Sequence, residues 1–204
     1  MELKGKKIAF LGDSITEGYG ASCVDKTYWS LIGQQTGALV YGYGIGGTTI
    51  ARRQKPLDVP NPNKYFGSRA GAMIPDADVI VIFGGTNDYG HGRLHLGAPT
   101  DNSPNTFCYE LRLLLDDLCQ KFGKNRLCFI LPLRRFSEDG VCCKGENGNE
   151  QGASLLEYVN VMRQIIAEYD VAAKMVRGYL EAIGAFSLFS RPSVIACIPY
   201  EATD

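Results

Sequence analysis

The sequence predicts an α/β fold in which helices cover both faces of a parallel sheet. Two observations indicate this fold class. Apolar, strand-like runs alternate with stretches of helical periodicity, and the most strand-like run, residues 79–83, is apolar at every position. A strand without polar side chains is typical of a sheet that is covered on both faces. Because 204 residues suffice for one domain and are too few for two, we expect a single doubly wound unit.

The first elements follow from side-chain type and glycine position. Residues 6–11 and 39–43 have the apolar and β-branched or aromatic content of strands, and each runs into a glycine-rich turn. Between them, residues 26–36 carry apolar side chains at helical spacing, and Gly37 is a natural helix stop. Residues 52–64 are polar and rich in proline and asparagine, which predicts an exposed loop.

The second half of the chain continues the alternation. Residues 106–121 form a strongly amphipathic pattern, with Ser103 or Asn105 as candidate N-caps. Residues 127–131 predict a fourth strand, and residues 154–169 again repeat apolar side chains every three or four positions.

Composition and charge exclude several classes of function. The formal net charge is −1, so we expect no nucleic-acid partner. No apolar run approaches the roughly 18 residues that span a bilayer, and the N-terminal one is shorter than the roughly 7–15 residues of a secretory signal. The seven cysteines are odd in number and form no C-x-x-C pair, so we expect no metal site and reduced thiols in a cytoplasmic protein.

Three glycine-led turns, each directly after a predicted strand, carry residues suited to ester chemistry. The first, residues 12–14 (Gly-Asp-Ser), places Ser14 at the end of the first strand. The second, residues 44–49, is a glycine cluster whose backbone N–H groups can approach a ligand, although a plain flexible loop has the same composition. The third, residues 84–88, carries Asn87. Open parallel sheets bind ligands at the carboxyl ends of their strands, where all three turns begin.

In this order the three blocks resemble the SGNH or GDSL hydrolase family, which has a nucleophile in a G-D-S block, an oxyanion-hole glycine in a second block and an oxyanion-hole asparagine in a G-x-N-D block. The resemblance spans residues 6–171 and includes the Pro-Leu-Arg-Arg run at residues 132–135. It implies a flavodoxin-like, three-layer α/β/α domain with a parallel sheet, of the SGNH hydrolase type. It also implies hydrolysis of a small-molecule ester or an acylated carbohydrate, with neither a metal nor a cofactor.

By this resemblance, Ser14 is the nucleophile, and its backbone N–H, the N–H of Gly47 and the side-chain amide of Asn87 form the oxyanion hole. The choice of this glycine within its block rests on alignment alone. Asp13 and Asp88 are supporting residues, and we expect Asp88 to brace its loop rather than touch substrate. Fixed donors around the oxyanion are usually the largest catalytic contribution, and losing one costs about 2.7–4 kcal/mol.

The catalytic base is missing from the expected place. In the family, His and Asp come from a D-x-x-H block near the C-terminus, and this sequence has no such block. Its two histidines, His91 and His95, both lie in the loop after the third block. We expect His91 to brace that loop or contact substrate rather than to act as the base.

The resemblance stops abruptly, which divides the chain into a hydrolase-like domain, residues 1–171, and an atypical tail, residues 172–204. A fifth, edge strand and a last helix are expected in the tail. Instead, residues 172–183 continue a helical pattern, and residues 186–198 are apolar with no acidic residue. A sudden loss of pattern is what a shifted reading frame produces, so our hypothesis is that the tail is frameshifted or replaced.

Functions from different classes therefore stay open. One is a serine ester hydrolase of the SGNH type that acts through an acyl-enzyme on Ser14 and is impaired in this chain. The alternative is a non-catalytic carbohydrate- or acyl-binding protein that retains the hydrolase pocket. A flavin or nucleotide binder of the same fold is disfavoured, because the chain lacks the G-x-G-x-x-G fingerprint in its required context. Neither the oligomeric state nor the acyl specificity follows from the sequence.

Overall fold

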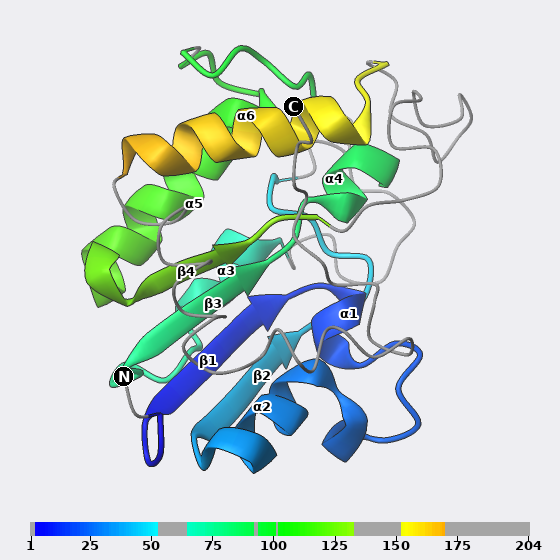
Figure 1. Cartoon of the computed structure of the whole chain (residues 1–204). Coiled ribbons are helices and arrows are strands. Elements are labelled where there is room, and N and C mark those ends of the chain that lie inside the picture. The colour runs from blue at the N-terminus through cyan, green and yellow to red at the C-terminus, as the bar shows by residue number, and fades with distance from the viewer. Residues whose placement is uncertain (1–2, 53–64, 92–93, 101, 133–151, 170–204) are drawn as a thin grey trace, which may run out of the picture.

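A computed structural model describes residues 3–52, 65–91, 94–100, 102–132 and 152–169. Its described strands form one four-stranded sheet in the order β2-β1-β3-β4, and every pairing is parallel (Figure 1). The strands are β1 (Lys7–Gly12), β2 (Leu39–Gly44), β3 (Val79–Phe83) and β4 (Leu127–Ile130). This order agrees with the first four strands of the flavodoxin-like arrangement, so the predicted fold class is confirmed.

The longer helices agree closely with the periodic stretches. They are α2 (Tyr28–Thr36), α5 (Phe107–Phe122) and α6 (Leu155–Glu168). Gly37 ends α2 in the left-handed region at φ 72°, as predicted, and Ser154 opens α6 with a capping box to Glu157. None of the described helices combines the length and the apolar character that crossing a membrane requires.

The predicted N-cap of α5 was wrong. The cap is Thr106, whose hydroxyl accepts a hydrogen bond from the Tyr109 N–H at 3.2 Å. Asn105 takes a left-handed backbone conformation, φ 72°, and the chain enters the helix one residue later than that prediction required. The helix therefore begins at Phe107, directly after Thr106, whose hydroxyl reaches a backbone N–H of the first turn.

Three shorter helices connect these elements: α1 (Ser14–Glu17), α3 (Phe66–Ala70) and α4 (Thr86–His91). Two 3-10 turns complete the described elements, Val24–Lys26 and Lys124–Arg126. Most of the predicted loop at 52–64, the loop after β4 and the whole tail 172–204 lie outside the described residues. The domain boundary at residue 171 and the hypothesis of an atypical tail that replaces the edge strand and last helix therefore stay predictions.

Side chains alternate between the two faces of the sheet and build two cores. Ala9 and Leu11 of β1 belong to the larger core, which also takes side chains from α3, α5 and α6. Ile8 and Phe10 belong to the smaller core, which α2 covers through Ile32. Figure 1 shows α5 and α6 together on one side of the molecule and α2 on the other.

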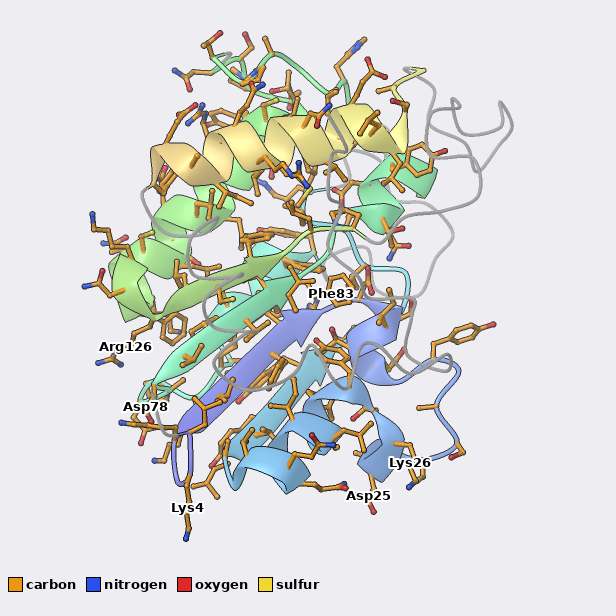
Figure 2. The ribbon with its side chains drawn as sticks, in the orientation of Figure 1. Lys4, Asp25, Lys26, Asp78, Phe83 and Arg126 are labelled. Carbon is orange, nitrogen blue, oxygen red and sulfur yellow. The ribbon has the colours of Figure 1, made fainter. Side chains whose placement is uncertain are left out.

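The parallel strands begin at one edge of the sheet, the amino edge, and end at the opposite one, the carboxyl edge. At the amino edge, Lys6 forms an ion pair with Asp78 at 3.1 Å, and Arg126 donates to the Ala77 carbonyl at 3.1 Å. Figure 2 shows Asp78 and Arg126 at this edge, whereas Phe83 marks the carboxyl end of β3. The candidate site residues lie at the carboxyl edge, where Gly12, Gly44 and Phe83 end their strands.

Candidate active site

Ser14 is the first residue of α1, directly beyond the end of β1, and its side chain is partly exposed. Asp13 caps the helix, because its Oδ1 accepts a hydrogen bond from the Ile15 N–H at 3.0 Å. The cap is therefore supplied by the aspartate, and the serine hydroxyl is not needed for it. A glycine is required at position 12, since a Cβ there would lie 1.9 Å from Oγ1 of Thr16.

Tertiary contacts hold α1 in place, because a helix of four residues has little stability of its own. A Cβ on Gly44 would lie 2.0 Å from the Glu17 nitrogen, so the helix backbone is pressed against the end of β2. On the other side, Trp29 Nε1 donates to the Thr16 carbonyl at 2.8 Å, and the Tyr28 hydroxyl lies 3.0 Å from Thr16 Oγ1. The position of Ser14 thus depends on β2 and α2 as well as on β1.

The loop at residues 44–51, called the 44–51 loop below, follows β2 and reaches α1. The Gly46 N–H donates to Oε2 of Glu17 at 2.9 Å. A Cβ on Gly46 would lie 3.7 Å from the Ser14 Cβ, so these two residues are neighbours. Gly47 has φ 70°, where glycine is strongly favoured.

Asn87 joins the third block to the second. It lies on α4, directly after β3, and its Nδ2 donates to the Thr48 carbonyl at 2.9 Å. The side-chain amide carries two hydrogens, so this bond orients the group and uses only one of them. The 44–51 loop is thus tied to α1 through Gly46 and to α4 through Thr48.

Asp88 supports the same loop from inside the protein. Its two carboxylate oxygens accept hydrogen bonds from the Ile50 and Ala51 N–H groups, each at 2.9 Å, and the residue is 2% exposed. Burial raises the pKa of Asp88 to about 6, against the opposite effect of the two N–H donors. These contacts direct the carboxylate toward the loop backbone.

Among the described contacts, none brings a histidine to the Ser14 hydroxyl, where a catalytic base would have to lie. His91 belongs to α4, but its side chain is outside the description, so its role stays a prediction. His95 is exposed, and its carbonyl accepts a hydrogen bond from the Phe107 N–H at 2.8 Å, at the start of α5. Among the described residues, no side chain forms a hydrogen bond with the Ser14 hydroxyl.

Sequence reasoning missed Arg69, which lies on α3 and is 8% exposed. Its guanidinium donates to the Gly12 carbonyl at 3.1 Å and to Oγ1 of Thr48 at 2.9 Å. Burial raises the pKa of Asp13, and the positive charge of Arg69 partly opposes that rise. A helix of five residues is too short to show a helical hydrophobic periodicity, so no sequence pattern marks Arg69.

The described residues contain no group of three or more His, Cys, Asp or Glu side chains that could hold a metal ion. The arrangement at the carboxyl edge offers a hydroxyl at a helix start, backbone N–H groups and one side-chain amide. It lies beside β1 and β3, which are neighbours although β2 comes between them in the chain. Such a switch point is where open α/β sheets bind ligands.

Comparison with known proteins identifies a family. A model of the GDSL-like lipase/acylhydrolase family matches residues 10–183. A solved structure of a protein from Lactobacillus plantarum is 28% identical over 83% of this chain and 76% of its own, with a TM-score of 0.65. No curated protein matches the chain.

Two more distant solved structures share the fold. A lipase/acylhydrolase from Enterococcus faecalis is 18% identical, with a TM-score of 0.54, over 94% of this chain and 87% of its own. A carbohydrate acetylesterase family member from Sinorhizobium meliloti is 19% identical, with a TM-score of 0.53, over 82% of this chain and 81% of its own.

Proposed function

The chain belongs to the GDSL-like lipase/acylhydrolase family, and from this premise we propose that it is a serine ester hydrolase that forms an acyl-enzyme on Ser14. The observation that carries the proposal is the double attachment of the 44–51 loop. Hydrogen bonds tie the loop to α1 through Glu17 and to α4 through Asn87. Three segments far apart in the sequence thus meet at the carboxyl edge, as an oxyanion site requires.

In the proposed reaction, Ser14 Oγ attacks the ester carbonyl carbon and gives its proton to solvent water, since no described side chain forms a hydrogen bond with the hydroxyl. The resulting oxyanion is stabilised by the backbone N–H groups of Ser14 and Gly47 and by the amide of Asn87. Collapse of this intermediate breaks the bond to the alcohol, which leaves with a proton, and water then hydrolyses the acyl-serine. The Ser14 N–H suits this role, because the first N–H groups of a helix have no partner within it.

The contacts around the other two donors fit the same scheme. Gly47 directly follows Gly46, whose N–H donates to Glu17, and Asn87 retains a second amide hydrogen beyond its bond to Thr48. The substrate class we propose is a small ester or an acylated carbohydrate, as the family implies. A serine hydrolase that lacks its base still retains a rate enhancement of roughly 10³–10⁴-fold over the reaction in water, which comes from its oxyanion hole and from substrate binding.

A second candidate is a non-catalytic carbohydrate- or acyl-binding protein. The observation that favours it is the lack of a described side chain bonded to the Ser14 hydroxyl, together with the lack of any histidine after residue 95. Such a protein would bind the carbonyl of an ester through the same donors and leave the bond intact.

Acylation of Ser14 by p-nitrophenyl acetate tests the proposal. We expect the protein to release p-nitrophenol faster than the Ser14→Ala variant and to carry one acetyl group on the peptide that contains Ser14, as found by mass spectrometry. Ser68→Ala is the matched control, since Ser68 is an exposed serine whose hydroxyl donates to the Tyr65 carbonyl at 2.7 Å. Equal rates for the protein and Ser14→Ala, with no acetyl-serine, would reject the esterase and favour the binding protein.

A further inference from the structure

Arg69 connects the strand ends that carry the candidate site. From α3, its guanidinium donates to the Tyr43 carbonyl at 2.5 Å, to the Gly12 carbonyl at 3.1 Å and to Oγ1 of Thr48 at 2.9 Å. The side chain also lies over the ring of Phe66, with 5.0 Å between Cζ and the ring centroid. One buried cation therefore contacts three segments of backbone and loop.

The three acceptors have a common relation to the site. Gly12 is the last residue of β1, two positions before Ser14, and Tyr43 lies near the end of β2. Thr48 follows Gly47, and its carbonyl accepts the hydrogen bond from Asn87. A shift of the guanidinium would therefore move both the nucleophile segment and the loop that carries the proposed backbone donor.

The charge of Arg69 is not neutralised by a direct ion pair among the described residues. Burial lowers its pKa to about 10, and the charges of Asp13 and Glu17 act against that shift, so the group is a cation at neutral pH. Its Nε atom is buried without a hydrogen-bond partner in the described part of the chain. A buried cation whose bonds go to neutral acceptors is costly for folding alone. Next to a site where negative charge develops during a reaction, the same cation would stabilise that charge.

We propose that Arg69 is a positioning residue of the oxyanion site: its guanidinium fixes Gly12 and the 44–51 loop, and its positive charge lies behind the donors when the oxyanion forms. The inference rests on the proposed function for its catalytic part. The positioning part concerns the loop itself and can be measured without turnover.

The kinetic test compares Arg69→Met, Arg69→Lys and Arg112→Lys in the p-nitrophenyl acetate assay. Arg112 is the matched control, because it is a largely buried arginine whose guanidinium bonds to Glu168 and the Pro99 carbonyl, away from the candidate residues. We expect Arg69→Met to lower kcat by about 10-fold or more with KM nearly unchanged, since the lost interaction acts on the oxyanion. Arg69→Lys restores the charge and recovers part of kcat, and Arg112→Lys changes neither constant.

Amide hydrogen exchange supplies a measurement that does not need activity. We expect exchange of the Gly47 and Thr48 amides to become about 10-fold faster or more in Arg69→Met and less so in Arg69→Lys, with the β3 amides unchanged. Exchange of these loop amides at the wild-type rate in both Arg69 variants would overturn the positioning role, as would an equal effect of Arg112→Lys. If the protein itself shows no Ser14-dependent hydrolysis, the proposed function fails, and the exchange rates still decide the role of Arg69.

Discussion

Replacing Asp88 by asparagine removes a buried negative charge from beneath the 44–51 loop while it preserves the shape of the side chain. The carboxylate is 2% exposed, and its oxygens accept hydrogen bonds from the Ile50 and Ala51 N–H groups, both at 2.9 Å. Burial raises its pKa from an ordinary 3.8 to about 6. The asparagine cannot titrate, so a comparison of the two proteins isolates the proton equilibrium of this one group.

The sign of the pH dependence follows from the direction of the shift. Because the folded protein holds the Asp88 proton more tightly than the unfolded chain, this group's contribution to stability is full below pH 3.8 and is lost as pH rises through about 6. Between pH 4.5 and pH 7.5, the free energy of unfolding of the wild type, minus that of Asp88→Asn, should fall by about 2 kcal/mol. A cost of about 1–3 kcal/mol for the acceptor that asparagine lacks adds a nearly constant offset.

Urea unfolding at several pH values, followed by the fluorescence of the single tryptophan, Trp29, measures this difference. Asp117→Asn, at an exposed position of α5, controls for the loss of one negative charge. A wild-type minus Asp88→Asn difference that is constant across this range would show that the N–H donors cancel the effect of burial. A difference that grows with pH would mean that the pKa is lowered, which would refute the reasoning.

Two further predictions concern the placement of the site. Asn87→Ala removes the proposed side-chain donor, and we expect a roughly 10²–10³-fold loss in kcat for p-nitrophenyl acetate with the fold retained; an unchanged kcat would remove Asn87 from the oxyanion hole. Gly44→Ala would place a Cβ 2.0 Å from the Glu17 nitrogen, so we expect it to destabilise the protein by about 1–3 kcal/mol or more in urea and to slow acetylation of Ser14. Gly71→Ala is its control, because Gly71 has helical φ −63° and open space around a Cβ; equal stability of the two variants would contradict the docking of α1 against β2.

Local patterns predicted the parts of the fold that local chemistry determines. The apolar run at Val79–Phe83 matches β3 residue for residue, and Gly37 ends α2, because strand composition and a glycine stop are both encoded within a few neighbouring residues. The N-cap of α5 was missed by one to three residues. The two candidate caps, Ser103 and Asn105, stand just before the observed cap Thr106, and the left-handed backbone conformation at Asn105 moves the helix start past both.

Contacts between distant residues could not be predicted in this way. Asp88 bonds to backbone groups of Ile50 and Ala51 that lie 38 and 37 positions earlier, and Arg69 reaches Gly12 across 57 positions. Such pairs depend on how the strand ends meet at one edge of the sheet, and no spacing rule encodes them. The order of the three blocks predicted which strand ends are candidates, whereas the network that holds them required coordinates.

In the proposed hydrolase, the part of the site that holds the carbonyl and the part that moves the proton belong to different stretches of the chain. In the described structure, the hydrogen bonds that position α1 and the 44–51 loop include several from side chains, those of Asp13, Glu17, Tyr28, Trp29, Arg69, Asn87 and Asp88. The family resemblance places the base in the C-terminal D-x-x-H block, within the stretch that we propose to be frameshifted or replaced. A changed tail would then remove the base and leave the oxyanion donors in place. Such a chain would still bind an ester and accept an acyl group from an activated one, but it would release that group slowly, so acetyl-Ser14 should accumulate where a complete triad would clear it.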